Sequence, residues 1–398
     1  MRPYDFDREP EEQEEFYEDE GRDLDESARR RNLFWPALRY IPTLKGSWRL
    51  AVLGGTLLLA AGTVLLLAGA SADWANFFCR LADWLRRGLS LLGSWSRRPL
   101  AEFVIPGVLL ALLFTGLRAA LRGLRTFIRW AANSFVAVCA AVLAFVLIYG
   151  VSYNAPALAG ELGYTVREYS VGELAYAMNK TVDMMNIYAE SLERDGSGRV
   201  LDPDFDKSAA AVMDSYRALS RQYPRFSQTA GVAPKQTRYI GALMSYLDLA
   251  GFFFPWTAEC VVSGNVYPTD VAFDTAHEAA HSMGIGPEDE CNFAAFLCLM
   301  NQEDPALRYS AAVHAYIYLG NALYGQSYEL WSTLYGRLEE LPRQDLRLRN
   351  QHLAQYDGPA NDLGNAVNDT YIKITGQPDG VRSYGKVADL LIAYFLEQ

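Results

Sequence analysis

The sequence predicts a mainly α-helical protein in which three membrane-spanning helices precede a mostly helical α+β domain. Three observations predict this fold class. Long uncharged apolar runs occur only within residues 48–152. From residue 153 to residue 398, apolar side chains recur mainly at helical spacing. One short stretch near residue 260 is rich in aromatic and β-branched residues, which is typical of strands.

Residues 1–47 combine an acidic tail with a basic approach to the membrane. The whole chain has a net charge of −11, and residues 1–27 alone carry 13 acidic and three basic side chains. A tail so charged and so poor in aliphatic residues is expected to be disordered, and it is a candidate docking peptide for a partner. The rest of the chain is nearly neutral, so nothing in the charge pattern favours nucleic-acid binding.

Residues 48–152 are expected to form the transmembrane region, with spans at about 51–70, 103–120 and 130–152. The first run begins too late for a cleaved signal peptide, and further spans follow it. Between the first two spans, residues 74–92 alternate large apolar side chains with arginines at helical spacing. This pattern predicts an amphipathic helix at the membrane interface, or alternatively a helix packed on the soluble domain.

Basic residues near the spans predict the orientation in the membrane. Ten lie before the first span or between the second and third, and six lie on the opposite side. We therefore expect a multi-pass protein of the cell membrane with a cytoplasmic N-terminus. Three crossings then place residues 153–398 outside the cytoplasm.

The domain at 153–398 is expected to consist mainly of helices. Apolar periodicity predicts them at 171–194, 206–222, 237–250, 271–283, 288–303, 306–323, 327–340 and 387–396. Thr269 and Asp270 are candidate caps of the 271–283 helix. One or two strands around 258–266 are expected before that helix. Val261–Val266 is then either an edge strand that pairs with an extended substrate or a purely structural hairpin.

The segment His277-Glu278-Ala279-Ala280-His281 carries two histidines four positions apart on a predicted helix. Positions i and i+4 share a face, so both imidazoles can bind one ion while Glu278 holds a water beside it. This H-E-x-x-H arrangement is that of zinc peptidases. The chain has four histidines, and the other two, His314 and His352, lack ligand spacing; His352 is expected in a loop. The alternative is an ordinary amphipathic helix whose histidines meet by chance.

A catalytic zinc needs a third protein ligand and one open position. Gly284 is suited to end the first helix and Pro287 to begin the next, which makes Glu288 a plausible third ligand. Residues Glu288–Asn292 resemble the E-x-x-A/C-D/N element of gluzincin peptidases, which implies that Glu288 binds zinc and that Asn292, one helical turn on, orients a ligand histidine. Glu290 is the alternative, but it has Ala294 in place of such a partner, so Glu288 is preferred.

These motifs, with several others, resemble a bacterial integral-membrane family, catalogued as a domain of unknown function, that combines N-terminal spans with a gluzincin-like zinc-peptidase domain. The resemblance covers about residues 50–396 and rests on Pro255–Cys260, His277–Phe293, Arg308–Ser310, Asn368–Tyr371 and Gly380–Lys386. It implies a zincin-like (gluzincin) fold and membrane-bound, zinc-dependent peptidase chemistry without a settled substrate. Cys260 and Cys291 depart from the small residues expected there, which leaves the metal site intact.

The predicted function is that of a membrane-anchored zinc metallopeptidase. Zn²⁺ bound by His277, His281 and Glu288 would polarise a water and the scissile carbonyl, with Glu278 as general base. The expected partners are a peptide or protein substrate and the lipid bilayer.

Three further residues are considered for a role in this chemistry. An oxyanion also needs a hydrogen-bond donor, for which Tyr384 and Arg382 are candidates; otherwise both are exposed polar residues of a loop. Glu259 is expected to be structural, rather than to bind a substrate amine or brace a histidine.

The alternative function is a catalytically silent, peptidase-like membrane scaffold or sensor. The intact Glu278 argues against it, because loss of the base is the simplest way to retire the activity. A transporter is disfavoured because the three predicted spans contain no charged residue apart from Arg118 near the end of the second. The five cysteines show no CxxC pair and predict no disulfide framework, although a bridge between Cys260 and Cys291 stays open.

Overall fold

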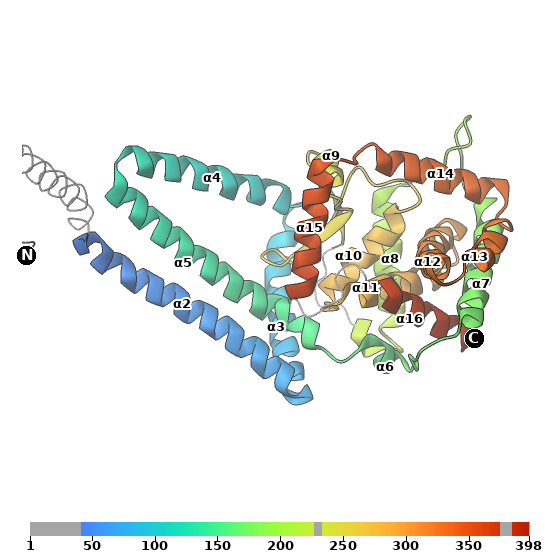
Figure 1. The fold of residues 1–398 in the computed structure, drawn as a ribbon, viewed down its shortest axis with the longest axis horizontal. Helices are drawn as coiled ribbons and strands as arrows, with labels where there is room; N and C mark the ends of the chain where they lie inside the picture. The colour runs from blue at the N-terminus through green and yellow to red at the C-terminus, as the bar shows by residue number, and fades with distance from the viewer. Residues whose placement is uncertain (1–40, 227–232, 375–383, 398) are drawn as a thin grey trace, which may run out of the picture. The chain divides into compact units, whose positions relative to one another are not determined.

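The computed structural model describes residues 41–226, 233–374 and 384–397 (Figure 1). Within these residues the protein is mainly helical, with one three-stranded sheet, which confirms the predicted mainly α character and the short strands. The acidic tail at residues 1–27 lies outside the described residues.

Three helices near the N-terminus are long and apolar enough to cross a membrane, as the sequence predicts. They are α2 (Ile41–Ala70), α4 (Ala101–Leu121) and α5 (Leu124–Ile148). The predicted end of the third span at residue 152 is wrong, because α5 stops at Ile148 and a 3₁₀ turn, η1 (Gly150–Asn154), follows. Helix α5 also begins before the apolar run. Its first turns contain arginines, which a search for uncharged apolar residues leaves out.

Helix α3 (Ala72–Ser94) covers the stretch where the sequence predicts an amphipathic helix. It begins at Ser71, whose side chain accepts a hydrogen bond from the backbone N–H of Trp74. Phe78, Ala82 and Arg86 are buried at helical spacing, whereas Trp84 is exposed. The helix therefore has one packed face and one face that carries exposed aromatic residues.

The chain divides into two compact units. Among the described residues, the first unit comprises 41–58 and 110–140, and the second comprises 59–109 and everything from 141 onward. In the first unit the Trp130 indole donates a hydrogen bond to the Thr115 hydroxyl (3.0 Å). The second unit contains the sheet, the remaining helices and all the residues of the candidate site.

The second unit has a helical core. Buried side chains of α7 (Val171–Ala189), α8 (Phe205–Leu219) and α12 (Pro305–Gln326) pack against those of α10 (Val271–Ser282) and α11 (Glu288–Met300). The last helix, α16 (Tyr384–Leu396), also packs on this core, as predicted. The shorter helices are α6 (Leu158–Leu162), α9 (Gly241–Tyr246) and α13 (Tyr328–Tyr335).

Two sequence predictions for this unit are wrong. The helix expected at 237–250 is only the six residues of α9, because strands lie on either side of it. Residues 347–371, for which the apolar pattern predicts no helix, are largely helical, in α14 (Glu340–Ala354) and α15 (Pro359–Ile374), so His352 lies on a helix and not in the expected loop. Leu341 and Leu346 of α14 pack against the core, but buried ion pairs also hold this helix, and its polar composition weakens the hydrophobic periodicity that would predict it.

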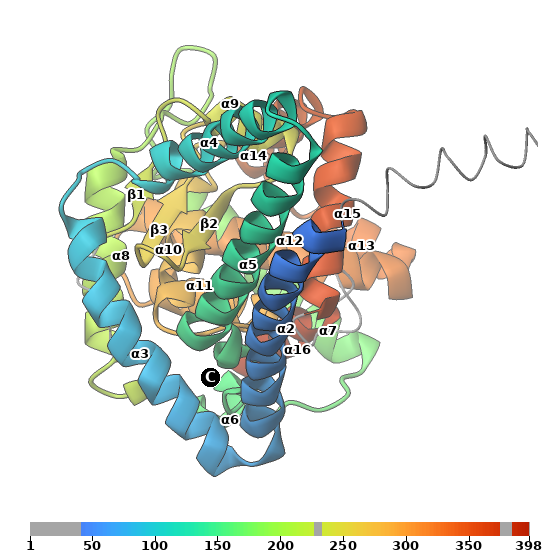
Figure 2. The ribbon, with the colours of Figure 1, turned by 90° about the vertical axis from the view of Figure 1, so that its left-hand side faces the viewer.

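The sheet has the strand order β1-β3-β2 (Figure 2). Strand β1 (Lys235–Gln236) pairs in parallel with β3 (Glu259–Val262), and β2 (Gly251–Phe254) pairs with β3 in the antiparallel direction, with Phe252 opposite Val261. The prediction of Val261–Val266 as an edge strand is therefore wrong. Strand β3 is central, and β2 forms the edge.

A buried carboxylate attaches the sheet to the start of α4. Glu259 is fully buried and accepts hydrogen bonds from the backbone N–H groups of Leu100 (3.0 Å) and Ala101 (3.3 Å). The same carboxylate pairs with the Lys235 ammonium at 2.6 Å. Glu259 thus caps the N-terminus of the second apolar helix, which is the structural role expected for it.

A buried arginine attaches α3 to the end of α5. The guanidinium of Arg86 is 1 % exposed and donates to the carbonyl of Ile148 at 2.7 Å, and it pairs with Asp83. A Cβ on Gly284 would lie 2.5 Å from this guanidinium, so the turn after α10 packs directly on it. The end of α5 is therefore fixed next to the turn that follows the histidine helix.

Candidate metal centre

The two histidines of the H-E-x-x-H segment lie on α10. Ala276 and Ala280 of this helix are buried in the core, whereas His277 and His281, each one position further on, line a cleft together with Phe273. Asp270 occupies the N-cap position, but its side chain pairs with Arg349 and makes no capping bond. The helix ends before Gly284, whose φ of +81° belongs to the left-handed region that glycine adopts without strain.

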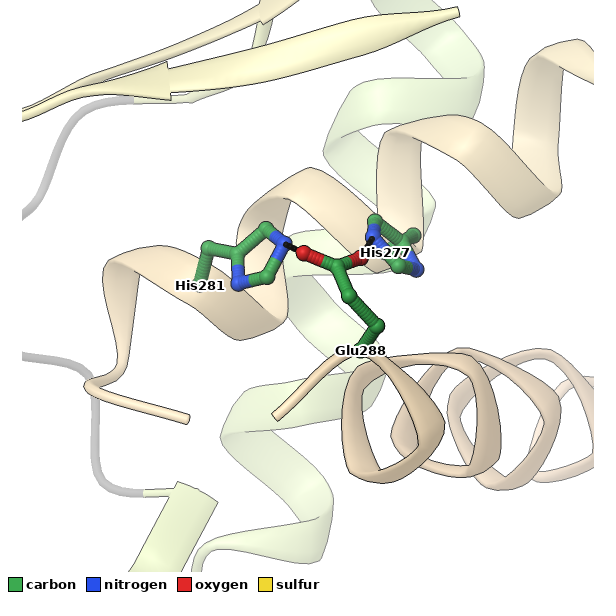
Figure 3. A group of neighbouring side chains, drawn as sticks. All are labelled: His277, His281 and Glu288. Carbon is green, nitrogen blue, oxygen red and sulfur yellow. Dashed lines mark ion pairs between the residues drawn. The ribbon is translucent and has the colours of Figure 1, made fainter. Parts of the chain in front are cut away.

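Glu288 reaches both imidazoles from the first turn of α11 (Figure 3). Its carboxylate lies 3.1 Å from Nε2 of His277 and 3.6 Å from Nε2 of His281. One ligand atom from each of these three residues lies within 4.8 Å of the others. The three side chains form the group of described residues that could hold a metal ion.

The other ring nitrogen of His277 has a partner. Its Nδ1 lies 2.8 Å from Oδ1 of Asn292, which can only accept a hydrogen bond. Nδ1 therefore carries a proton, which leaves Nε2, on the side of Glu288, as the nitrogen that would bind a metal.

His281 is oriented in the same way by a different set of groups. Its Nδ1 lies 3.0 Å from the Ile285 carbonyl, 2.6 Å from the Tyr149 hydroxyl and 3.1 Å from Sγ of Cys291. The Ile285 carbonyl is an obligate acceptor, so Nδ1 is the protonated nitrogen and Nε2 is free to bind a metal.

Glu278 lies beside the cluster with one oxygen unused. The side chain is 5 % exposed, and its Oε2 has no hydrogen-bond partner among the described residues. Burial raises the pKa of Glu278 to about 7, and the nearby Glu288 carboxylate adds to the rise. Burial alone would also raise the pKa of Glu288, but the imidazoles of His281 and His277 outweigh it and lower this pKa.

A cleft of about 570 Å³ opens over these side chains. His277, Glu278, His281 and Glu288 all line it, and strand β2 forms one wall. A Cβ on Gly251, the first residue of β2, would lie 2.6 Å from Cγ of Glu278. The edge strand therefore touches the glutamate, and only glycine fits there.

The donor set fits zinc. Two neutral imidazoles and one carboxylate are a common ligand set of catalytic zinc sites. Zinc binds such atoms at about 2.0–2.2 Å, so tetrahedral ligands lie roughly 3.3 Å apart, close to the 3.1 and 3.6 Å between Glu288 and the imidazoles. The unpartnered Oε2 of Glu278 is a suitable acceptor for a water at the remaining position.

The remaining sequence candidates lie apart from this cluster. Glu290 points the other way and accepts a hydrogen bond from the backbone of Leu158 (3.0 Å). His314 stacks on Phe273 and pairs with Asp270, and Nε2 of His352 contacts the Asn265 carbonyl. Arg382 and the side chain of Tyr384 lie outside the described residues.

Two residues of the site have no local signal in the sequence. Tyr149 stands at the end of an apolar run and Gly251 before a string of phenylalanines, and only the fold brings them to His281 and Glu278.

Cys291 also contacts His281. Cys260 and Cys291 are both free thiols, so the bridge that the sequence leaves open is not formed.

The fold and the site define a helical protein with three potential membrane spans and a cluster of two histidines and a glutamate on its second unit. The chain matches, over residues 77–392, the family described as "Protein of unknown function (DUF3810)". The match spans most of the chain, so the protein belongs to this family, and the resemblance to a family of unknown function is confirmed. No curated protein and no solved structure matches the chain.

Proposed function

We propose that this protein is a membrane-anchored, zinc-dependent metallopeptidase. The observation that carries the proposal is the unpartnered Oε2 of Glu278, buried beside His277, His281 and Glu288 in an open cleft. A buried carboxylate oxygen without a partner is costly, and such groups are typical of catalytic sites. A scaffold that only binds a metal would not require an unpartnered carboxylate oxygen beside the metal ligands.

Each residue of the cluster has a role in this proposal. His277, His281 and Glu288 hold the zinc, and Asn292 and Tyr149 keep the imidazole nitrogens in the required tautomer. Zinc supplies Lewis acidity, which lowers the pKa of a water and polarises the scissile carbonyl.

Glu278 moves the proton. Its Oε2 takes a proton from the attacking water as the oxygen adds to the carbonyl carbon. The same carboxyl then gives the proton to the leaving amine as the C–N bond breaks. Tyr384 and Arg382 remain the predicted donors to the oxyanion.

The substrate binds along strand β2 in this proposal. Strand β2 is the edge of the sheet and lines the cleft, so its free backbone groups can pair with an extended peptide. A hairpin with one edge over the histidine helix, followed by a helix that carries the third ligand, supports a zincin-like domain of the gluzincin type.

Metal content tests the site. We expect detergent-purified protein to hold about one zinc per chain, and His281→Ala and Glu288→Ala to lose it. Glu290→Ala and His352→Ala are matched controls that keep it, because neither side chain reaches the cluster. Absence of zinc from the wild type after incubation with the metal would overturn the proposal.

Peptide cleavage tests the activity. A peptide library should be cut by the wild type and not by Glu278→Gln, with zinc content equal in the two proteins. Zinc binding without cleavage would instead indicate the silent scaffold or sensor.

We also propose that the N-terminus is cytoplasmic and that residues 153–398 lie outside the cytoplasm. The excess of basic residues around the first span and between the second and third supports this orientation. A protease added to the outside of intact cells should digest the domain at 153–398. Digestion only after the membrane is opened would reverse the assignment.

A further inference from the structure

The cleft over the candidate metal centre is partly walled by the apolar helices themselves. Ile105 of α4 and Phe145 of α5 line it together with strand β2. Trp256, just after β2, lines the same cleft, and its ring centroid is 6.5 Å from that of Phe145. Both helices belong to segments long and apolar enough to cross a membrane. The cleft is therefore shared between the domain and its spans.

These wall residues lie near the ends of their helices. Ile105 is the fifth residue of α4, and Phe145 is the fourth residue from the end of α5. At about 1.5 Å per residue, each lies roughly one turn from the helix end that meets the domain. The 21 residues of α4 just span a hydrocarbon core about 30 Å thick, so one turn from its end lies roughly 5 Å inside the boundary of that core, next to the bilayer interface. Trp256, 40 % exposed, is a residue type typical of that depth.

Buried contacts fix the metal cluster at this depth. Tyr149 directly follows α5 and contacts His281 at 2.6 Å, while Glu259 holds the start of α4 through Leu100 and Ala101. Separation of the cluster from the span ends would break the buried hydrogen bonds from Leu100 and Ala101 to the Glu259 carboxylate, which is unfavourable. The cleft therefore stays at the membrane surface.

The apolar wall of the cleft continues onto the outer surface of α4. Ile105 is 37 % exposed, and Val104, Val108 and Leu109 are exposed on the same helix. An apolar helix that lies against this surface delivers the residues next to it straight into the cleft. A peptide that reaches the cleft from solution would not need to contact this apolar surface of α4.

We propose that the substrate is a membrane-anchored polypeptide, cut in the extended segment next to its own membrane span. This inference rests on the proposed peptidase function and names its substrate class. Anchoring in the same membrane confines the segment to the height of the cleft. Such confinement raises the effective concentration and typically strengthens binding by about 10²–10⁴-fold without a new contact.

The test compares anchored and free forms of one peptide library. Twelve-residue random segments are joined to a common leucine-rich, 20-residue helix and reconstituted into vesicles with the full-length zinc-loaded protein; the same segments without the helix are the free form. We expect anchored segments to be cut at least tenfold faster. The cuts should fall within about ten residues of the helix, a reach of roughly 33 Å for an extended chain. Equal rates, or faster cleavage of the free form, would overturn the inference.

Binding is measured separately, so that the substrate class is still tested if hydrolysis fails. In Glu278→Gln protein, a photo-crosslinking residue replaces Ile105, and a control protein carries it in place of Tyr324, which is exposed and lies away from the cleft. Crosslinks from position 105 to the anchored library alone support the inference, even if neither library is cut and the peptidase proposal fails. Crosslinks from position 105 to lipid only, or equally to both libraries, contradict it.

Discussion

The hydroxyl of Tyr149 lies 2.6 Å from Nδ1 of His281, although 132 positions separate the two residues in the chain. Tyr149 directly follows α5, and His281 is a candidate metal ligand in the last turn of α10. The contact is buried and stands beside the Ile285 carbonyl, which shares the same ring proton. The tautomer and orientation of His281 thus depend partly on the end of the third apolar helix.

Tyr149→Phe should weaken zinc binding without loss of the fold. Groups that orient a ligand histidine typically contribute about 10–100-fold to metal affinity, and Ile285 keeps part of that role in the variant. A competition titration against a zinc chelator measures the change. Tyr316→Phe is the matched control, because the Tyr316 hydroxyl is buried without a partner among the described residues. Equal zinc affinity in all three proteins would show that Tyr149 does not position His281.

The core of the candidate site could be predicted from the sequence because its geometry is local. His277, His281 and Glu288 lie within twelve consecutive residues on two helices, and helix geometry with a glycine turn is enough to bring them together. Asn292 follows by the same helical spacing. Tyr149 and Gly251 could not be predicted, since their approach depends on long-range packing.

The dependence on long-range contacts also explains why parts of the fold are predicted wrongly from the sequence. Helix α14 carries few apolar residues, and it is anchored by Asp345 to Arg194 and by Arg349 to Asp270. A periodicity of apolar side chains cannot detect a helix held by ion pairs. The central position of β3 likewise depends on the parallel pairing of Lys235 and Gln236, a strand of two residues with no pattern of its own.

Gly251→Ala should lower the proposed peptidase activity while zinc stays bound. The added Cβ would lie 2.6 Å from Cγ and 2.7 Å from Oε1 of Glu278, so the glutamate must move from the position in which the proposed mechanism uses it as the base. We expect kcat to fall at least tenfold, which corresponds to about 1.4 kcal/mol of the barrier. Gly325→Ala on α12 is the control, because a Cβ there meets nothing within 4 Å. Unchanged kcat in Gly251→Ala would contradict the role given to Glu278.

Glu259→Gln should destabilise the protein strongly. The substitution leaves the Lys235 ammonium buried without its counter-charge, and removal of one partner from such a pair typically costs about 3–5 kcal/mol. Denaturant unfolding in detergent measures the loss. Glu340→Gln removes an exposed pair with Arg347 and should change stability by less than about 1 kcal/mol.

A double variant separates charge from packing in this contact. Lys235→Met combined with Glu259→Gln should recover part of the stability, because no unpaired charge then remains buried. A double variant no more stable than Glu259→Gln alone would show that the cap on α4, rather than the ion pair, is the main contribution.

Asp270 should make the stability of the domain depend on pH at the acidic end. Burial alone would raise the pKa of Asp270, but Arg349 and His314 outweigh it and lower this pKa. A carboxyl with a lowered folded-state pKa contributes its full stability above its unfolded pKa, about 3.9, and loses it as the pH falls toward the folded value. Two groups that also face this contact titrate differently: burial lowers the pKa of His314, and burial together with Asp270 raises that of Asp274.

Comparison of the wild type with Asp270→Asn isolates this contribution, because His314 and Asp274 are present in both proteins. We expect the variant to be about 3 kcal/mol less stable above pH 5, where Arg349 has lost its buried partner. The difference should shrink below pH 4 as Asp270 is protonated in the wild type. Asp202→Asn, at a side chain that is 81 % exposed, should show no such convergence. A constant difference between wild type and Asp270→Asn from pH 7 to pH 3 would mean that the Asp270 carboxylate does not stabilise the start of α10 through its charge.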